Sequence, residues 1–243
     1  MKDIFNDNVS LKTETPAFAK HVLPAVPSSE VYLEDCVTAL KRFNDNHFDL
    51  AIVDPPYGIG ADSQKESYSQ GKNGEGRRHR KLWEHKGWDE NIPTAEYWNE
   101  LFRVSKNQII WGGNYFADVL PISRGWIFWD KGYENTNNFS AGELAWTSFD
   151  KILKKIYITN RIMPHQIHEN IHPCQKPTKL YDWVLQNYAE EGDLILDTHL
   201  GSGSIAIACH DYGFDLTACE LDKEYFDKAM ERIKNHVSQL KMF

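Results

Sequence analysis

The sequence predicts an α/β fold with a mostly parallel sheet, and three observations lead to this prediction. Residues 48–53 form a short apolar run that stops at Asp54-Pro-Pro-Tyr57, which is typical of a buried parallel strand opening into a loop. From residue 172 onward, expected strands and amphipathic helices alternate, which favours right-handed parallel units. The length of 243 residues suits one large domain with a substantial core.

The individual elements follow from apolar patterning and from residues that end helices and strands. Residues 1–29 are polar and contain three prolines, so an irregular lead-in is expected. Strands are expected at 31–33, 48–53, 108–111, 126–129, 155–159, 193–197 and 214–219. A short helix is expected at 37–43, and apolar residues at helical spacing behind Pro177 predict a helix that ends at Gly192. Further helices are expected at 202–212, closed by Gly213, and along the apolar face from Phe226 to Leu240.

The charge balance limits nucleic-acid binding to a local surface. The 27 Lys and Arg residues and 35 Asp and Glu residues give a net charge of −8, so the surface as a whole does not attract DNA or RNA. Residues 61–81 differ, because they carry six basic and three acidic side chains and almost no apolar ones. We therefore expect a mobile basic loop at 61–81, and a loop that is merely solvated is the alternative.

Membrane, secretory and metal-binding classes are disfavoured by what the sequence lacks. No apolar run reaches the ~20 residues of a membrane span, and the N-terminal stretch has no apolar signal core, so a cytoplasmic protein is expected. The four cysteines form no CxxC pair and lie near no histidine at zinc-finger spacing. They are expected to be reduced thiols, and no metal site is predicted.

A glycine-rich turn follows the expected strand 193–197. It reads Asp197-Thr-His-Leu-Gly-Ser-Gly-Ser204, and Glu220 follows the next strand. The glycines let the backbone approach a ligand at a helix N-terminus, and an acidic residue after the second strand suits ribose hydroxyls. Taken alone, this pattern also fits a nicotinamide or flavin enzyme, or a plain strand–helix turn.

The motif Asp54-Pro55-Pro56-Tyr57 at the end of a buried strand is more specific. Pro55 restricts Asp54 to extended backbone geometry, and neither proline carries an N–H. The turn thus offers a carboxylate, a carbonyl oxygen and the flat face of Tyr57. These groups suit a planar ring that bears an –NH₂ group, with its two hydrogens on Asp54 and the Pro55 carbonyl and its ring stacked on Tyr57.

A third motif and the order of all three carry a family resemblance. His172-Pro-Cys-Gln-Lys-Pro177 is by itself a turn and a helix start, and His172 is interpreted as a structural histidine. The pair Asp-Pro-Pro-Tyr and Asp-x-x-x-Gly-x-Gly resembles the S-adenosylmethionine-dependent amino-methyltransferases of DNA, and its order resembles their β class. The resemblance extends from about residue 31 to residue 233 and is weakest at 61–165. It implies a Rossmann-like methyltransferase fold with a mixed, mostly parallel sheet, helices on both faces and a small target-recognition insertion, in a single domain over 1–243.

The resemblance also implies which residues form the site. Glu34-Asp-Cys36 resembles a Gly-Asp-Cys box whose Asp holds the cofactor's adenine, with Glu34 here in place of Gly. The box at 172–177 flanks the cofactor's methionine end in the family, and His199 stands where Phe is common. The implied catalytic residues are Asp54, Pro55, Pro56 and Tyr57. The implied cofactor-binding residues are Asp35, Cys36, Lys176, Thr178, Asp197, His199, Gly201, Ser202, Gly203 and Glu220.

The implied reaction is methyl transfer to the exocyclic amine of adenine in DNA. Hydrogen bonds to Asp54 and to the Pro55 carbonyl localise the lone pair of the amine, which attacks the sulfonium methyl of S-adenosylmethionine in line. A base in a duplex must be flipped out to reach such a pocket. Double-stranded DNA is therefore the expected partner, with base readout from 126–171. Backbone contacts are expected from Arg77, Arg78, Arg80 and Lys81. A homodimer and a bacterial or phage origin are inferred from the resemblance alone.

Several alternatives stay open. Related sites modify the cytosine exocyclic amine, adenine in RNA or glutamine in proteins, although Asp54 favours adenine. A ring-carbon methyltransferase needs a Pro-Cys nucleophile, and this role is rejected because Pro173-Cys174 lies in the Lys-Pro box. A nicotinamide oxidoreductase would leave Asp-Pro-Pro-Tyr unexplained. An inactive methyltransferase-like subunit usually loses one of the two main motifs, and both are intact here.

Overall fold

The computed structural model describes residues 20–22, 28–62, 83–133, 140–159 and 170–239. The strands within these residues are β1 Lys20–Val22, β2 Ser29–Leu33, β3 Phe48–Val53, β4 Ser105–Trp111, β5 Trp126–Asp130, β6 Gly142–Thr147, β7 Lys154–Tyr157, β8 Leu194–Asp197 and β9 Asp215–Glu220. The helices are α1 Cys36–Leu40, α2 Ala95–Val104, α3 Thr178–Tyr188, α4 Ser204–Tyr212 and α5 Lys223–Val237, with a short 3-10 helix η1 at Gly113–Tyr115.

All of these strands join one sheet in the order β1-β2-β9-β8-β3-β4-β6-β5-β7. The central strands β2, β9, β8, β3 and β4 run parallel, while β6 pairs antiparallel with both β4 and β5. The predicted mixed, mostly parallel sheet is therefore confirmed. β1 pairs antiparallel with β2, so the prediction of an irregular lead-in over 1–29 is wrong for residues 20–22.

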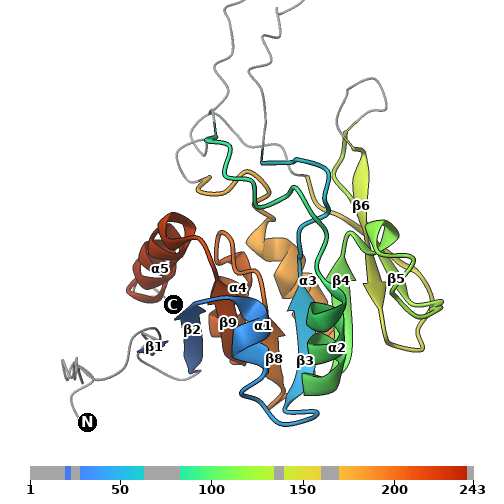
Figure 1. The fold of residues 1–243 in the computed structure, drawn as a ribbon, viewed down its shortest axis with the longest axis horizontal. Helices are drawn as coiled ribbons and strands as arrows, with labels where there is room; N and C mark the ends of the chain where they lie inside the picture. The colour runs from blue at the N-terminus through green and yellow to red at the C-terminus, as the bar shows by residue number, and fades with distance from the viewer. Residues whose placement is uncertain (1–19, 23–27, 63–82, 134–139, 160–169, 240–243) are drawn as a thin grey trace, which may run out of the picture.

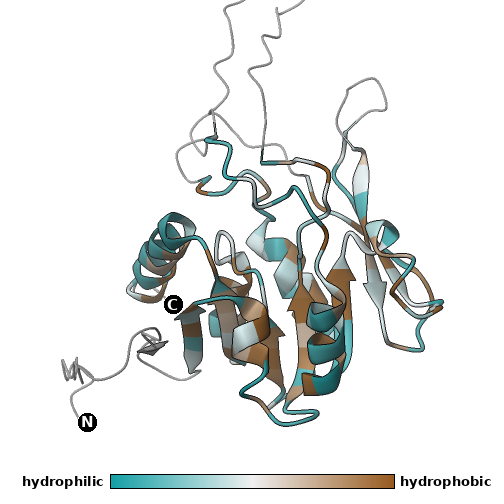
Figure 2. Cartoon of the chain, viewed as in Figure 1, coloured by the Kyte–Doolittle hydropathy of each residue, from teal (hydrophilic) through white to brown (hydrophobic). Residues whose placement is uncertain are grey.

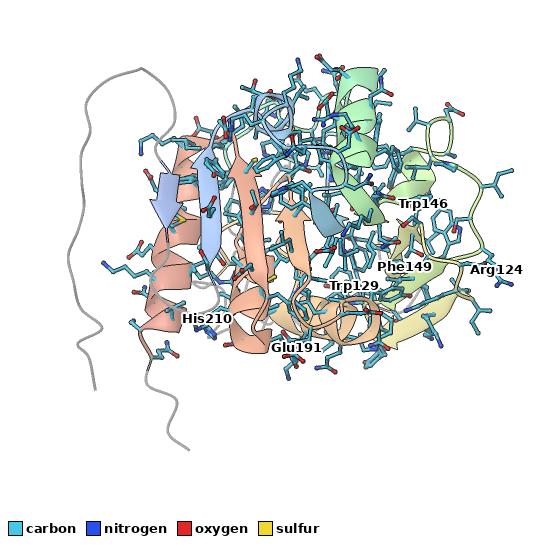
Figure 3. The ribbon with its side chains drawn as sticks, turned by 90° about the horizontal axis from the view of Figure 1, so that it is seen from below. Arg124, Trp129, Trp146, Phe149, Glu191 and His210 are labelled. Atoms are coloured by element: carbon cyan, nitrogen blue, oxygen red, sulfur yellow. The ribbon has the colours of Figure 1, made fainter. Side chains whose placement is uncertain are left out.

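Helices cover both faces of the sheet, as predicted. Figure 1 shows α1 and α2 in front of the strands and α3 and α4 behind them. Side chains of a strand alternate between its faces, so Leu50 and Ile52 pack with α3, α4 and α5, whereas Ala51 and Val53 pack with α1 and α2. Figure 2 accordingly shows brown, apolar central strands between helices with hydrophilic outer surfaces. The aromatic-rich strands β5 and β6 contribute the buried side chains of Trp129 and Trp146 to the core. Figure 3 shows both residues from below.

The connectivity places a crevice at one edge of the sheet. From β3 the chain passes through α2 to β4 on one side, and from β8 it passes through α4 to β9 on the other side. Since β3 and β8 are parallel neighbours, their connections diverge from a shared carboxyl edge. Ligands of open α/β sheets bind at such a switch point. Asp54 follows β3 and Asp197 ends β8, so the two main motifs meet there.

Besides β1 and the short η1, the elements α2 and β6 are not among the predicted ones. Thr94 caps α2, and its buried face includes Tyr97 and Leu101, yet this short aromatic pattern does not differ clearly from a loop in the sequence. β6 lies inside 126–171, where a base-readout segment is expected, and its partners β4 and β5 precede it in the chain. Together β5, β6 and β7 extend the main sheet, and their role in base readout stays a prediction.

Some predicted element ends are shifted. The helix α3 ends at Tyr188 rather than at Gly192, and Pro177 is its N-cap rather than a first-turn residue. The helix α4 begins after Gly203, whose φ of 72° is left-handed and suits glycine. Gly213 closes α4 with a φ of 82°, as predicted.

The expected basic loop 61–81 is described only at its first two residues. Arg77, Arg78, Arg80 and Lys81 lie outside the described residues, so their contacts with DNA stay predictions. Asp62, in contrast, is fully buried and accepts hydrogen bonds from the backbone N–H groups of Lys86 and Gly87. Among the described residues no helix is both long and apolar enough to cross a membrane.

Candidate active site

A cavity of about 1940 Å³ opens at the carboxyl edge of β3, β8 and β9. Residues of all three sequence motifs line it, which joins segments that lie far apart in the chain. The predicted site residues that line it are Asp35, Cys36, Asp54, Pro55, Pro56, Tyr57, Lys176, His199, Gly201, Ser202 and Glu220. The predicted residues Thr178, Asp197 and Gly203 lie behind this lining.

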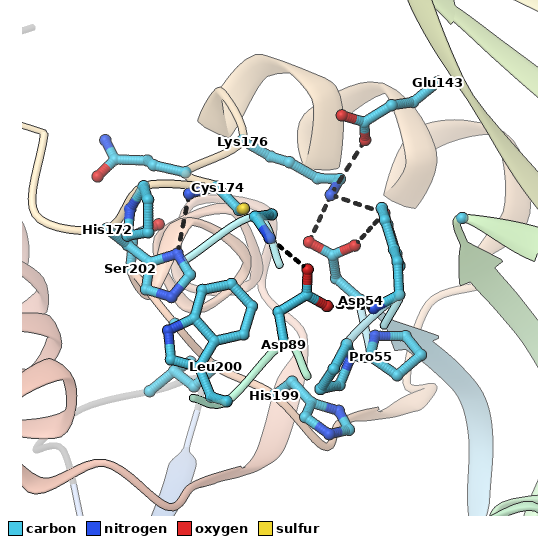
Figure 4. A pocket seen from close by; sticks show the side chains of 18 of the residues that line it. Asp54, Pro55, Asp89, Glu143, His172, Cys174, Lys176, His199, Leu200 and Ser202 are labelled. Atoms are coloured by element: carbon cyan, nitrogen blue, oxygen red, sulfur yellow. Dashed lines mark hydrogen bonds and ion pairs between the residues drawn. The ribbon is translucent and has the colours of Figure 1, made fainter. Parts of the chain in front are cut away.

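Asp54 is held by two partners at the end of β3. The Tyr57 hydroxyl donates to Asp54 Oδ1 at 2.6 Å, and the Lys176 ammonium donates to Asp54 Oδ2. Figure 4 shows Asp54 and Lys176 converging in the cavity. Each carboxylate oxygen keeps a further lone pair for a ligand. Burial and the Asp54 charge raise the pKa of Tyr57 well above its usual value, so the phenol stays a donor.

The loop that carries Tyr57 is pinned by Asp89, a residue that the sequence analysis does not single out. Asp89 Oδ1 accepts from the backbone N–H groups of Tyr57 at 2.6 Å and Gly58 at 2.9 Å, and Oδ2 accepts from Ala61 at 2.7 Å. Asp89 is 1% exposed, so these charge-assisted bonds form away from water. Because neither Pro55 nor Pro56 has an N–H, an outside acceptor is what orders the rest of this turn.

Lys176 lies between two carboxylates. Its Nζ contacts Asp54 Oδ2 and lies 3.2 Å from Glu143 Oε2, while Glu143 Oε1 accepts from Lys131. Burial disfavours the ammonium, but the charges of Asp54 and Glu143 outweigh it and raise the pKa of Lys176. Burial likewise opposes ionisation of Glu143. The positive charges of Lys176 and Lys131 outweigh this effect of burial, and the pKa of Glu143 is lowered. Lys176 is therefore directed at Asp54, and its predicted contact with the cofactor stays a prediction.

The Tyr57 ring is packed between backbone and another ring. A side chain at Gly112 would meet Tyr57 Cε1 at 2.2 Å, so the ring needs a glycine there. Tyr115 stacks on Tyr57 with centroids 4.9 Å apart and planes 14° apart, and Phe116 meets it edge-on at 6.0 Å. Tyr115 is 44% exposed, so its ring forms the solvent-facing side of this stack.

The glycine-rich turn and Glu220 form the other half of the cavity. Glu220 Oε2 accepts from the N–H of Gly201 at 2.8 Å, and Oε1 accepts from Asp222 at 2.9 Å. Each oxygen keeps one lone pair toward the cavity, consistent with the predicted ribose contact. Asp35 has a structural role that was not predicted. Its Oδ1 caps α1 by accepting hydrogen bonds from the N–H and the hydroxyl of Thr38. Its Oδ2 is the oxygen that can receive an adenine amine.

Asp197 and His199 form a hydrogen bond within the glycine-rich turn. Asp197 Oδ1 accepts from the His199 N–H at 3.0 Å, and burial raises the pKa of Asp197 to about 8, with repulsion from Asp54 and Glu220 adding to it. Burial lowers the pKa of His199 to about 4, so its ring is neutral. His199 Nδ1 bonds the Thr198 hydroxyl at 2.9 Å.

The pKa of Asp197 predicts a pH-dependent stability difference. Because the folded pKa of about 8 exceeds the ordinary 3.8, the folded state binds the proton more tightly, and the free energy of unfolding falls as pH rises from about 4 to 8. Asp197→Asn cannot ionise and keeps the acceptor for His199. We expect the melting temperature of the variant, relative to that of the unaltered protein, to rise by at least about 3 °C between pH 5 and pH 9, measured by thermal unfolding without cofactor. An equal offset at both pH values would contradict this assignment.

Ser202, Ser204 and Thr178 are linked through one arginine. Arg232 of α5 donates to the Ser202 carbonyl at 2.7 Å, to the Ser204 hydroxyl at 3.0 Å and to the Thr178 hydroxyl at 3.4 Å. A side chain at Gly203 would meet Ile233 at 2.9 Å, so the turn packs closely on α5. These residues therefore shape the turn from behind, and a direct cofactor contact of Thr178 stays a prediction.

The remaining reactive groups of the cavity are held neutral. Burial raises the pKa of Cys36 and of Cys174 to about 12, so neither is a thiolate nucleophile. Burial lowers the pKa of His172 to about 3, and its ring packs on Trp88 and Tyr225. This agrees with its interpretation as a structural histidine. Over the described residues, no three His, Cys, Asp or Glu side chains gather in a group that could hold a metal ion.

Comparisons with known proteins find similarity to DNA methyltransferases. The DNA methylase family N6_N4_Mtase matches residues 122–231. The chain is 25% identical over 241 residues to the type II methyltransferase M.HpaI of Haemophilus parainfluenzae, covering 82% of this chain and 72% of that protein. It is 23% identical over 261 residues to the type II methyltransferase M2.MboI of Moraxella bovis, covering 86% of this chain and 91% of that protein.

Solved structures share the fold. The M1.HpyAVI–SAM complex superposes with a TM-score of 0.58 at 19% identity, over 84% of this chain and 99% of that chain. The cytosine-N4-specific PvuII DNA methyltransferase superposes with a TM-score of 0.54 at 12% identity, over 87% of this chain and 92% of that chain. With the two motifs meeting at the switch point, these matches show that the chain is similar to DNA methyltransferases of the N6/N4 type.

Proposed function

We propose that this protein transfers a methyl group from S-adenosylmethionine to the exocyclic N6 amine of adenine in double-stranded DNA. One observation carries the proposal: the Asp54 carboxylate, held by Tyr57 and Lys176, faces the same cavity as Glu220 and the glycine-rich turn. The choice of adenine rests on Asp54 at the first position of the motif. The N4 amine of cytosine is the competing target, since the fold is shared with a cytosine-N4-specific enzyme.

The donor set of the cavity fits the proposed cofactor. Glu220 has a free lone pair on each oxygen for ribose hydroxyls, and Asp35 Oδ2 can accept from an adenine amine. Gly201 and Gly203 adopt φ values of 54° and 72°, which brings backbone close to the cavity without side chains in the way. The carboxylates on this side suit a ligand that carries a sulfonium and an ammonium. When bound, S-adenosylmethionine supplies an electrophilic methyl group.

The residues around Asp54 then activate the amine by position and charge. The Asp54 carboxylate and the Pro55 carbonyl each accept a hydrogen bond from one N–H group of the target amine. These hydrogen bonds turn the nitrogen lone pair out of conjugation with the ring. Positive charge grows on the nitrogen during transfer, the fixed carboxylate stabilises it, and the methylated nitrogen then loses one proton to bulk water. Tyr57 orients Asp54 through the 2.6 Å hydrogen bond. No side chain has to form a covalent bond, consistent with the protonated Cys174.

The target base reaches Asp54 by base flipping in this proposal, and it stacks in the slot between Tyr57 and Tyr115. The two rings are 4.9 Å apart, too close to admit a base between them, so Tyr115 must move outward. Its 44% exposure supports that movement. The free energy needed to unstack the target base from the duplex is then offset by the stacking of this base on the two aromatic rings.

Tyr115→Ala is expected to raise the KM for DNA about tenfold, because base–aromatic stacking contributes about 1–3 kcal/mol. Steady-state kinetics with mixed-sequence DNA and saturating cofactor measure this change. Tyr115→Phe keeps the ring and should stay within about twofold of the unaltered protein. A KM unaffected by Tyr115→Ala would show that the base does not stack on Tyr115.

The proposed function is tested by following a labelled methyl group from S-adenosylmethionine. Mixed-sequence DNA and total RNA are offered in parallel, and the products are digested to nucleosides and identified. Label in N6-methyladenine of DNA is the expected result. Label in N4-methylcytosine would show that cytosine, and not adenine, is the target base. Label in RNA alone would show that RNA is the substrate. No label, despite measured cofactor binding, would favour an inactive subunit.

Contacts to the DNA are part of the same proposal. The phosphate backbone is assigned to Arg77, Arg78, Arg80 and Lys81, and sequence readout to segments within 126–171. We place the reaction in the cytoplasm of a bacterium, on a protein of bacterial or phage origin, and association into a homodimer stays a prediction.

A further inference from the structure

Four charged side chains alternate in sign next to the proposed target amine. Asp54, Lys176, Glu143 and Lys131 form one row, in which Lys176 bridges the two carboxylates and Lys131 contacts the far oxygen of Glu143. Figure 4 shows Lys176 between Asp54 and Glu143. Lys176 is 4% exposed and Lys131 12% exposed, so water screens these charges weakly. The reaction as described above makes no use of Glu143 or Lys131.

Asp54 alone beside a buried lysine is a poor partner for an amine that becomes cationic. Lys176 Nζ already donates to Asp54 Oδ2, and it also lies 3.5 Å from the Tyr57 hydroxyl. An isolated Asp54–Lys176 pair has no net charge, and its ammonium faces the place where positive charge develops. A methyl transfer that relies on Asp54 therefore needs a second anion to hold Lys176.

Glu143 is placed to be that anion. Its Oε2 lies 3.2 Å from Lys176 Nζ, on the opposite side from Asp54. It comes from strand β6, where it pairs with Trp129 of β5, so its backbone is fixed by the sheet. Lys131 follows β5 directly and holds Oε1, and its N–H donates to the Ala141 carbonyl. The Glu143 carboxylate is thus held toward Lys176.

We propose that Glu143 is a positioning residue for methyl transfer, which draws the Lys176 ammonium away from Asp54 when the target amine binds. Asp54 then faces the amine with an uncompensated negative charge. Lys131 keeps the row neutral overall, so that the unliganded site holds no excess charge. This inference rests on the proposed function, because it assigns a role within the same methyl transfer.

The test is the single-turnover rate of methyl transfer to DNA, with cofactor binding measured separately by calorimetry. Glu143→Gln removes one negative charge and leaves the shape unchanged, so the row carries a net positive charge. We expect the rate to fall about 30- to 100-fold, with cofactor affinity within about twofold of the unaltered protein. Glu143→Asp keeps the charge and should retain at least about a fifth of the rate.

A second variant separates this charge effect from simple loss of packing. Lys176→Met combined with Glu143→Gln removes the ammonium that Glu143 is proposed to draw away and makes the row neutral again, and the rate should rise at least about fivefold above Glu143→Gln alone. A purely structural role for Glu143 predicts the opposite, because the double variant loses both contacts and would be as slow or slower. Arg124→Ala is the control, since Arg124 forms an exposed ion pair with Asp150 and lies at the edge of the molecule in Figure 3.

The outcomes also separate this inference from the proposed function. If the unaltered protein labels no nucleic acid, the proposed function fails and the role of Glu143 fails with it. If the unaltered protein is active and Glu143→Gln keeps more than half of its rate, only the role of Glu143 is overturned. A double variant that is slower than Glu143→Gln overturns the electrostatic role in the same way.

Discussion

Asp54→Ala is expected to lower the single-turnover methyl-transfer rate about 1000-fold. The variant loses the acceptor for the target amine and the negative charge that stabilises the cationic nitrogen, and removal of one such preorganised group typically costs 10²- to 10³-fold. It also leaves the buried Lys176 ammonium with Glu143 as its remaining carboxylate partner, next to the reacting nitrogen. Cofactor affinity should change by less than about threefold, because Glu220 and the Gly201 turn lie on the other half of the cavity.

Asp54→Asn is the matched variant, because it keeps the shape of the side chain and one acceptor oxygen. We expect it to retain more activity than Asp54→Ala but to stay at least about 100-fold below the unaltered protein. Quench-flow measurement of labelled methyl transfer gives the rates, and calorimetry gives cofactor affinity. Full activity of either variant would show that another group accepts the amine, and the assignment of Asp54 would be wrong.

Asp89→Ala is expected to lower both activity and stability, although Asp89 itself is not assigned a contact with substrate. It leaves the backbone N–H groups of Tyr57, Gly58 and Ala61 without their buried acceptor. Unsatisfied buried donors cost about 1–3 kcal/mol each, so a melting temperature lower by about 6 °C or more is expected. The Tyr57 loop no longer holds Asp54, and the methyl-transfer rate should fall at least about 100-fold.

The conservative variant Asp89→Asn separates position from charge. Its carbonyl oxygen can still accept from Tyr57 and Gly58, whereas its amide cannot accept from Ala61. We expect intermediate losses, with rate and melting temperature falling together across the two variants. Rates are compared at a temperature well below both melting points. An Asp89→Ala protein that is unstable yet fully active when folded would show that the loop orders without Asp89.

The parts of the site that could be predicted from the sequence are continuous stretches with local rules. Proline geometry at 55 and 56 and glycine at 201 and 203 determine backbone shape within a few residues, and Glu220 stands one strand further on. The alternation after residue 172 likewise identifies α3, β8, α4 and β9, apart from their ends. The end of α3 at Tyr188 instead of Gly192 reflects packing, since Tyr188 is buried and the residues after Ala189 turn toward β8.

The parts that could not be predicted depend on contacts between distant segments. Asp89 meets Tyr57 across 32 positions, and Lys176 meets Asp54 across 122. Glu143 and Lys131 lie in a stretch of sequence without a motif. Their place in the row of charges beside Asp54 depends on the pairing of β6 with β4 and β5. The position of Tyr115 on Tyr57 also follows from η1 after β4, because Gly112 and Gly113 turn the chain there.

The sequence by itself thus determined the α/β class, the two motifs and the groups that would face an amine and a cofactor, because short-range covalent geometry sets them. The tertiary structure alone decided which charges surround Asp54 and which ring covers Tyr57. Strand order brings 54, 143 and 176 together, and in a buried site electrostatic energy depends on distances of a few ångströms rather than on separation along the chain.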